Sequence, residues 1–305
     1  MSKDILRITR PINMTDGMLS DVNVPESNYD AWSADTTYQD GKRVYLATNN
    51  LVYQSVKDDN TGNNPSDIGS AFWVEVGPTN RWAMFDTSYS TKTKNSSTIS
   101  FTITPNQVVS TFAAAALVDA ASIQVTVSST DGGGVIYDET FDLSNGSVEA
   151  GWWQFFFGDR SRSNQLTVFN LPPRIDAVIT VTISGGDDLA VGTVLFGETD
   201  EIGLGISLGS RVGIRDYSRK ETNEFGESVL VQRAYAHRMT IEVLIESSEV
   251  DIVQNILSDV RALPILWTAT DTYKSMNFVG FYKNFEILIS YPNQSFVELE
   301  IEGIP

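Results

Sequence analysis

The sequence contains no cysteine, and it has a single histidine, His237, in 305 residues. Without cysteine the chain can form no disulfide, no thiolate nucleophile and no cysteine-type zinc site. A catalytic triad or a histidine-based metal site would need partners for His237 that the sequence does not identify. We therefore expect a structural or surface role for His237, and we predict no catalytic residue, no metal site and no cofactor.

Long hydrophobic runs and an excess of basic residues are also lacking. The richest apolar run, Phe112 to Val118, is much shorter than the roughly 20 residues of a membrane span, and the first residues show no apolar segment typical of a secretory signal. Lys and Arg number 21 against 39 Asp and Glu, a formal net charge of -18. This acidity disfavours nucleic acid and membranes as partners, and it leaves neutral sugars and protein subunits open. Solubility alone explains the acidity equally well.

Acidic pairs and glycine-rich stretches give weak signals for a ligand site. Asp58-Asp59 and Asp187-Asp188 offer oxygens that calcium prefers, but neither has the alternating spacing of an EF-hand loop. We interpret both as solvated turns. The stretch GLGISLG, Gly203 to Gly209, lacks the lysine and the strand-to-helix context of a phosphate loop.

The length and the strand-like patterns predict a mainly β, multi-domain protein. The expected parts are an N-terminal arm at 1–27, a small aromatic β module at 28–85, an antiparallel β-sandwich at 86–198 and a C-terminal α+β domain at 199–305. The arm begins with strand-like alternation and continues as a polar stretch. We expect it to dock onto another domain or subunit.

The aromatic module combines a hairpin signal with many large rings. The runs 43–47 and 51–56, separated by Thr48-Asn49-Asn50, predict a β-hairpin with a tight loop. Because a domain this small cannot fill a core with aliphatic residues alone, aromatic rings should carry the burial. The rings concerned are Trp32, Tyr38, Tyr45, Tyr53, Trp73 and Trp82.

The region 86–198 shows a series of strand candidates without helices between them, which favours an antiparallel sandwich or jelly roll. The candidates are 98–104, 122–127, 135–143, 152–157, 165–171 and 177–183, with breaks at 131–134, 144–147, 172–173 and 185–188. The segment WWQFFF, Trp152 to Phe157, would be apolar on both faces of a strand. It is either a core strand or a strand whose outer face meets a partner.

The C-terminal region contains the clearest helix signal. Ser248 is the candidate N-cap, and the helix should end before Pro264. One face of the helix would carry Val250, Val253, Ile256, Leu257 and Val260. We expect a strand at 228–245 before the helix and three after it, at 265–270, 277–291 and 296–304, as a meander that turns at Pro292-Asn293.

The order of residues in 28–82 resembles the small chitin- and cellulose-binding modules of bacterial chitinases. The matching pattern is Tyr29-x-x-Trp32, Tyr38 with Gly41, Val44, Tyr53, Gly62-x-x-Pro65 and Phe72-Trp73. The resemblance implies sugar binding by aromatic stacking, with Trp32 and Trp73 mainly structural and with Asn63-Asn64 where those modules usually place a ligand-facing aromatic. The candidate carbohydrate-binding residues are Trp32, Tyr38, Tyr45, Tyr53, Asn63, Asn64, Trp73 and Trp82.

A wider resemblance covers nearly the whole chain. The segments GPTNRWAMFD from Gly77, VGIRDYSRKETNEFGESVLVQRAYAHR at 212–238 and the ending from Phe281 resemble a family of phage tail proteins. Members are often labelled carbohydrate-binding because of the aromatic module. The resemblance implies a virion component near the tail tip or baseplate, assembled in the host cytoplasm in several copies with other tail proteins. It implies no catalytic residue.

Three functions follow from these observations. The first is a non-enzymatic structural subunit of the tail tip or baseplate, forming a homo-oligomer. The second is an adhesin that binds host cell-surface polysaccharide through residues 28–82. The third is a glycan-degrading enzyme with an accessory binding module, but 86–198 offers no identifiable pair of catalytic carboxylates. We expect the first.

Overall fold

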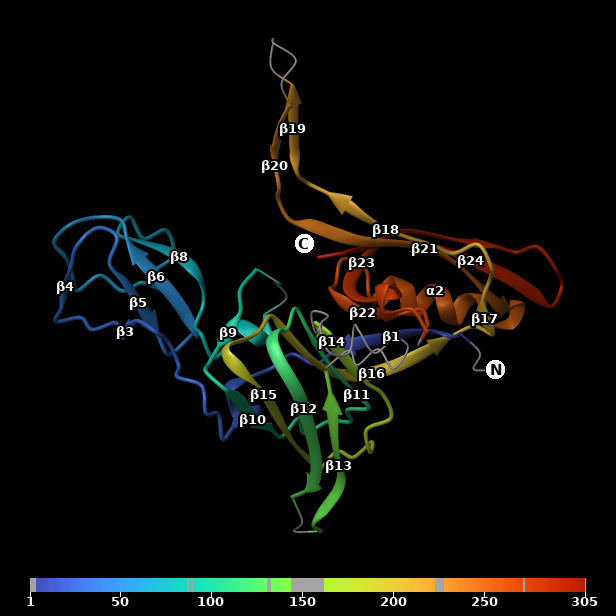
Figure 1. The fold of residues 1–305 in the computed structure, drawn as a ribbon, viewed down its shortest axis with the longest axis horizontal. Helices are drawn as coiled ribbons and strands as arrows, with labels where there is room; N and C mark the ends of the chain where they lie inside the picture. The colour runs from blue at the N-terminus through green and yellow to red at the C-terminus, as the bar shows by residue number, and fades with distance from the viewer. Residues whose placement is uncertain are drawn as a thin grey trace, which may run out of the picture. The chain divides into compact units, whose positions relative to one another are not determined.

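The computed structural model describes residues 4–86, 88, 90–130, 133–143, 162–222, 228–270 and 272–304 (Figure 1). The fold is mainly β, with one α-helix on an antiparallel sheet, as the sequence predicts. The chain forms two compact units, Met1–Ile12 with Phe196–Pro305 and Asn13–Leu195. We call them the C-terminal unit and the central unit. The strand expected at 152–157 and the break expected at 144–147 lie outside the described residues.

The C-terminal unit is built on one antiparallel sheet in the order β16-β1-β22-β23-β24-β21-β17, with β18 also paired to β21. The N-terminal segment is part of this sheet, because β1 pairs with both β16 and β22. The last three strands are neighbours in sequence order, so the expected meander is confirmed. The strands are β1 (Leu6–Pro11), β16 (Thr193–Ile202), β17 (Gly205–Ile206), β18 (Arg211–Asp216), β21 (Tyr235–Glu246), β22 (Ile265–Thr268), β23 (Asn277–Leu288) and β24 (Gln294–Gly303).

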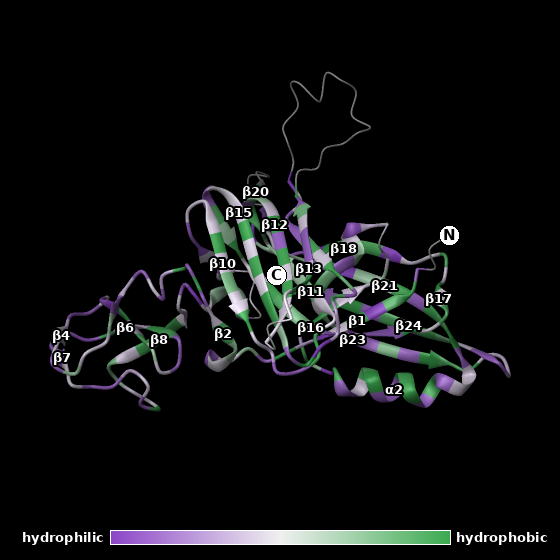
Figure 2. Cartoon of the chain, turned by 90° about the horizontal axis from the view of Figure 1, so that it is seen from below, coloured by the Kyte–Doolittle hydropathy of each residue, from purple (hydrophilic) through white to green (hydrophobic). Residues whose placement is uncertain are grey.

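The helix α2, Val250–Asp259, covers one face of this sheet (Figure 2). Val253, Leu257 and Val260 are buried in the same core as the apolar residues of β21, β24 and β22. Residues three or four apart share one face of a helix, so this spacing is what packs α2 onto the sheet. The predicted helix and its apolar face are confirmed.

The predicted N-cap of this helix is wrong. Ser248 lies in a 3-10 turn, Ser247–Glu249, and the N-cap position of α2 is Glu249, which makes no side-chain cap bond. The Ser248 hydroxyl instead donates to Glu246 Oε2 at 3.4 Å. The turn leads directly into the helix, so the serine lies one residue too early to cap it.

The single strand expected at 228–245 is also wrong, because the chain forms two strands there. β20 (Ser228–Val231) pairs with β19 (Arg219–Thr222), whereas β21 pairs with β18 and β24. In the described part of the chain β19 and β20 pair only with each other. We call this two-stranded element the ribbon, and Figure 1 shows it projecting away from the sheet beyond β18 and β21.

The central unit contains a second antiparallel sheet in the order β13-β12-β15-β10-β2, with β9 paired to β15. Ile123, Val125 and Val127 alternate with partly exposed residues along β12, which is typical of a strand with one buried face. The strands are β2 (Leu19–Ser20), β9 (Thr93–Lys94), β10 (Thr98–Ile103), β12 (Val118–Ser129), β13 (Val135–Asp142) and β15 (Ala177–Val191), and β11 (Thr111–Ala115) pairs with β14 (Gln165–Val168).

The break expected at 185–188 is wrong, because β15 continues through it to Val191. The pairing of β12 with β15 shifts register here, because Ala120 pairs with Gly185 but Val118 pairs with Ala190, so most of the extra residues lie in β15. A Cβ atom on Gly185 or Gly186 would collide with the backbone or the side chain of Asp119. The two glycines therefore permit β12 to approach β15 closely at a bulge, where the sequence predicted a turn.

The aromatic module has a four-stranded sheet in the order β3-β5-β6-β8 and a separate pair, β4-β7. β5 and β6 form the predicted hairpin, with Asn50 in the left-handed region at φ 59°. The strands are β3 (Asp30–Ala31), β4 (Thr37–Tyr38), β5 (Arg43–Leu46), β6 (Leu51–Ser55), β7 (Asn60–Thr61) and β8 (Trp73–Pro78). The remaining 3-10 turns are Asp16–Met18, Ala83–Phe85 and Lys274–Met276.

Candidate functional site in the aromatic module

Most of the predicted sugar-binding rings form the core of the module. Tyr38, Tyr53 and Trp73 are buried together with Val44, and Trp32 packs against this cluster. The rings of Tyr38 and Trp73 meet edge to face, with centroids 5.2 Å apart. Their faces are occupied by other side chains, so a sugar ring cannot stack on them.

The polar ends of Tyr38, Tyr53 and Trp73 are satisfied within the module, whereas Trp32 Nε1 is buried without a hydrogen-bond partner. The Ser33 N–H donates to the Tyr38 hydroxyl at 2.7 Å, and the Asn49 amide donates to the Tyr53 hydroxyl at 2.6 Å. Buried tyrosine and tryptophan usually find such partners. Trp73 Nε1 does so by donating to the Asn63 carbonyl oxygen at 2.9 Å.

Asn63 and Asn64 shape their own loop. The Asn63 amide donates to Asn60 Oδ1 at 2.9 Å. Asn64 Oδ1 accepts from the N–H and the hydroxyl of Ser66, each at 3.0 Å. This is the local bonding by which asparagine side chains stabilise turns. These polar atoms already have partners within the chain.

Trp82 lies apart from the other predicted site residues. Its ring meets Phe85 edge to face at 5.6 Å, and Phe85 meets Phe101 of β10 in the same way at 5.4 Å. Trp82 therefore belongs to an aromatic chain that leads to the second sheet of the central unit. The structure does not bring it together with Tyr38, Tyr53 and Trp73.

The opposite face of the module sheet carries a different set of groups. Arg43 and Tyr45 alternate with the core residue Val44 along β5, and Arg43 Nε donates to Gln54 Oε1 of β6 at 3.0 Å. Arg43 Nη1 also donates to the Tyr29 hydroxyl at 3.1 Å, and its guanidinium lies 5.8 Å from the Tyr29 ring centroid. We call Tyr29, Arg43, Tyr45 and Gln54 the outer tyrosine face.

The outer tyrosine face has the chemistry that a sugar site needs. Tyr29 is 40% exposed and Tyr45 is partly exposed. Aromatic rings can pack against the C–H face of a pyranose, while the guanidinium of Arg43 and the amide of Gln54 can bond its hydroxyls. Of these residues only Tyr45 was among the predicted site residues. The alternation of β5 is the signal that could have identified Arg43.

A pocket of about 430 Å³ lies within this module. Polar and apolar groups both line it, and Lys42 forms an ion pair there with Asp30, 3.1 Å between Nζ and Oδ2. Tyr38 also lines it, but only 4% of that residue is exposed. The pocket lining is Asp30, Ala31, Thr36, Thr37, Tyr38, Gln39 and Lys42.

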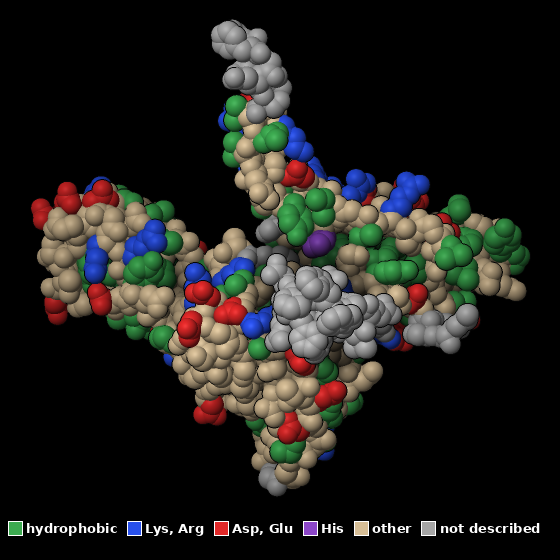
Figure 3. All heavy atoms as spheres, viewed as in Figure 1, with side chains coloured by type: hydrophobic (Ala, Val, Ile, Leu, Met, Phe, Trp, Pro, Cys, Tyr) green, Lys and Arg blue, Asp and Glu red, His purple; other side chains and the backbone are tan. Residues whose placement is uncertain are grey.

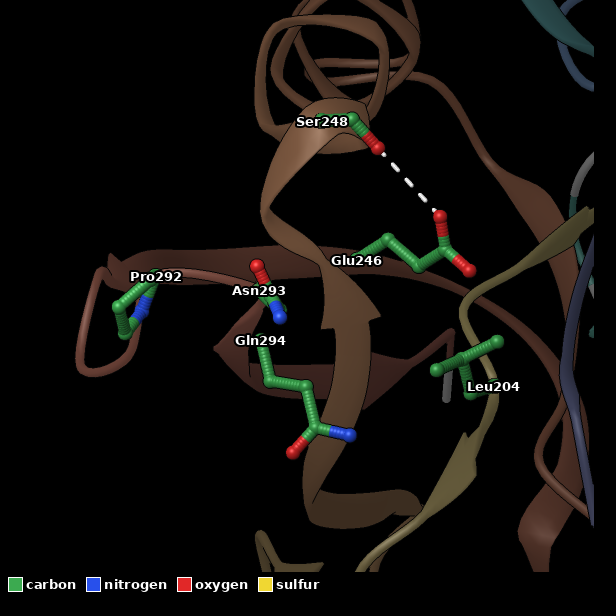
Figure 4. Close-up of a pocket in the computed structure, with 6 residues that line it drawn as sticks. All are labelled: Leu204, Glu246, Ser248, Pro292, Asn293 and Gln294. Carbon is green, nitrogen blue, oxygen red and sulfur yellow. Dashed lines mark hydrogen bonds between the residues drawn. The ribbon is translucent and has the colours of Figure 1, made fainter.

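A second pocket, of about 370 Å³, lies in the C-terminal unit at the turn between β23 and β24 (Figure 4). Glu246 and Ser248 face each other across it, and Gln294 and Asn293 add polar groups. Glu246 carries the one ionisable side chain in this lining.

His237 packs as an aromatic residue. Its ring stacks on Phe278 with centroids 5.5 Å apart, and Tyr235 meets it edge to face at the same distance. Burial lowers the pKa of His237 below its ordinary value, because the charged imidazolium loses hydration. The ring is therefore mainly neutral near pH 7.

Comparisons with family models and curated proteins found no relative of this chain. No family model matches the sequence, and no curated protein matches it either. Among the residues that the structure describes, no helix is long and apolar enough to cross a membrane. Within the same residues, no group of three or more acidic, histidine or cysteine side chains is placed to hold a metal ion.

Proposed function

We propose that this chain is a non-enzymatic structural subunit of a phage tail tip or baseplate and that it assembles in several copies. The ribbon carries this proposal, because it lies in the segment with the most specific resemblance to phage tail proteins. Val229, Leu230 and Val231 are 54%, 70% and 46% exposed on it. Exposed apolar residues on a strand with unpaired edges mark a surface that meets another chain.

The attachment of the ribbon supports the same function. A two-stranded element is marginally stable by itself in water, so it needs support from its base or from a partner. At the base, Arg215 and Tyr217 both bond the buried carboxylate of Glu302 in β24. The ribbon is thus held firmly at one end while its apolar side chains remain in solvent, which suits an assembly element.

Immunogold electron microscopy tests this function directly. Antibodies against the purified chain should label one end of the tail of virions released from the strain that carries the gene. A control serum against an unrelated cytoplasmic protein should give no tail label. Virions that contain no copy of the chain, by labelling and by mass spectrometry, would refute the proposal.

A second candidate function is binding of host polysaccharide by the outer tyrosine face. The observation in its favour is the network in which Arg43 joins Tyr29 to Gln54 beside Tyr45. Such a face would serve a tail protein that meets the cell surface. A glycan array probed with the full chain tests it, and retention of no host polysaccharide would count against this role.

A further inference from the structure

The sheet of the C-terminal unit places three glutamates in one row on the face opposite α2. Glu242 of β21 lies directly opposite Glu298 of β24, which lies directly opposite Glu286 of β23. All three side chains are exposed. Like charges directly opposite each other destabilise a sheet, and in the described part of the chain none of the three has an ion-pair partner. We call them the glutamate row.

An apolar row lies beside the glutamate row. Leu244, Phe296 and Leu288 are directly opposite one another, two residues further along the same three strands. Leu288 is exposed, and the other two are partly exposed. The solvent face of an antiparallel sheet is normally polar, so acidic and apolar rows together are typical of a face that another chain covers.

The ribbon has the complementary chemistry. The segment 211–238 contains six Lys and Arg against four Asp and Glu, in a chain whose net charge is -18. Within the ribbon, Arg219 lies opposite Val231 and Lys220 lies opposite Leu230. Figure 3 shows hydrophobic and basic side chains close together on this element. Both ribbon cations form exposed ion pairs within their own chain, Arg219 with Glu221 and Lys220 with Asp216. Exposed pairs of this kind contribute little, so these cations can exchange partners, and the ribbon offers cations and apolar groups to the carboxylates and apolar groups of the two rows.

We propose that the ribbon of one copy binds the two rows of a second copy, with its cations against the glutamates and its apolar side chains against Leu244, Phe296 and Leu288. The inference rests on the proposed function, since it names the partner in a multi-copy assembly. The ribbon cannot reach the rows of its own copy. Its base is held by Arg215 and Tyr217 at Glu302, and it projects away from the sheet (Figure 1).

The contact joins two different surfaces, so every copy offers one ribbon and one pair of rows. Such a head-to-tail contact closes into a ring or continues as a filament. It also reduces the repulsion in the glutamate row, because the cations of the ribbon lie against its carboxylates. The assembly should weaken as salt is added, since exposed charges are screened.

Two variants of the full chain test the contact by light scattering after size exclusion. Leu230→Glu removes the apolar centre of the ribbon and leaves the rows intact, whereas Glu298→Lys reverses the centre of the glutamate row and leaves the ribbon intact. Each variant alone should lose the oligomer of the wild type. A mixture of the two should form a one-to-one dimer, because the intact ribbon of Glu298→Lys binds the intact rows of Leu230→Glu.

The controls distinguish this contact from others. Glu75→Lys, an equal charge reversal at an exposed position of β8, should assemble like the wild type. If ribbons paired with ribbons, Glu298→Lys would still assemble by itself and the mixture would give no mixed dimer, which overturns the inference. A wild type that stays monomeric at its highest soluble concentration overturns it as well. Immunogold labelling of the tail tests the proposed function independently. A failure of the ribbon contact can therefore be distinguished from a failure of the proposed function.

Discussion

Arg215 Nη1 donates to both carboxylate oxygens of Glu302, at 3.2 and 3.1 Å. The Glu302 side chain is 5% exposed, and it also accepts from the Tyr217 hydroxyl at 2.7 Å and from Lys283. Burial by itself raises the pKa of Glu302, but the hydrogen bonds from Lys283, Tyr217 and Arg215 outweigh it, so the pKa is lowered. This carboxylate joins the base of the ribbon to the last strand.

Replacing Glu302 by Gln should lower the free energy of unfolding by about 1.5–3 kcal/mol, as expected for lost hydrogen bonds to charged groups. Urea denaturation measures the loss, and hydrogen exchange should locate it in β18 and β24. Arg238→Gln is the control, because it breaks an exposed ion pair with Glu300 that should contribute less than about 1 kcal/mol. Equal losses in the two variants would contradict the buried role of Glu302.

Replacing His237 by Phe should make the protein less sensitive to mild acid. Burial lowers the pKa of His237 in the folded state, so the unfolded chain binds the proton more readily and stability falls as pH drops below the unfolded value near 6.5. Urea denaturation of both proteins between pH 7 and pH 5 measures this. The difference in stability between variant and wild type should grow as pH falls; a constant difference would show that His237 does not titrate in this way.

Replacing Trp73 by Ala should unfold the aromatic module. Removing a buried tryptophan side chain costs about 3–5 kcal/mol, and the variant also loses the bond to the Asn63 carbonyl. Hydrogen exchange in β5 and β6 should accelerate strongly. The neighbouring Val74→Ala, at an exposed position, should leave that exchange unchanged within experimental error.

Replacing Tyr29 or Tyr45 by Ala should abolish any retention of the chain on host polysaccharide while the module remains folded. Both residues lie on the outer tyrosine face, and neither belongs to the buried core cluster. Tyr53→Phe is the matched control, because it removes a core hydroxyl that bonds Asn49 and leaves the outer face unchanged. Loss of retention in Tyr53→Phe alone would place the sugar site elsewhere.

Replacing Gly185 by Ala should destabilise the central unit by about 1–3 kcal/mol through overpacking. The new methyl group would collide with the carbonyl group of Asp119, which is backbone and cannot move aside easily. Gly213→Ala is the control, since nothing lies near its Cβ position and it also occupies a strand. Thermal denaturation of both variants should show a lower midpoint for Gly185→Ala alone.

Local sequence patterns were sufficient where one element supplies its own signal. Period-two alternation predicts β12, and the spacing of Val253, Leu257 and Val260 predicts the buried face of α2. The patterns were insufficient where a neighbouring strand decides the local structure. The glycines at 185–186 suggest a turn, because the register shift between β12 and β15 depends on both strands and is not visible in one segment. The strand 228–245 divides because its two halves have different partners.

The sequence by itself determined that 28–82 would bury large rings around a hairpin. Only the tertiary structure decided which side chains remain exposed to solvent. The sheet turns Tyr53 and Trp73 toward the core, and a separate segment brings Tyr29 to Arg43. The glutamate row likewise depends on the pairing of β24 with both β23 and the more distant strand β21. A shift of one residue in any strand would reverse its faces. Strand register comes from the packing of the whole core, so no single segment encodes it.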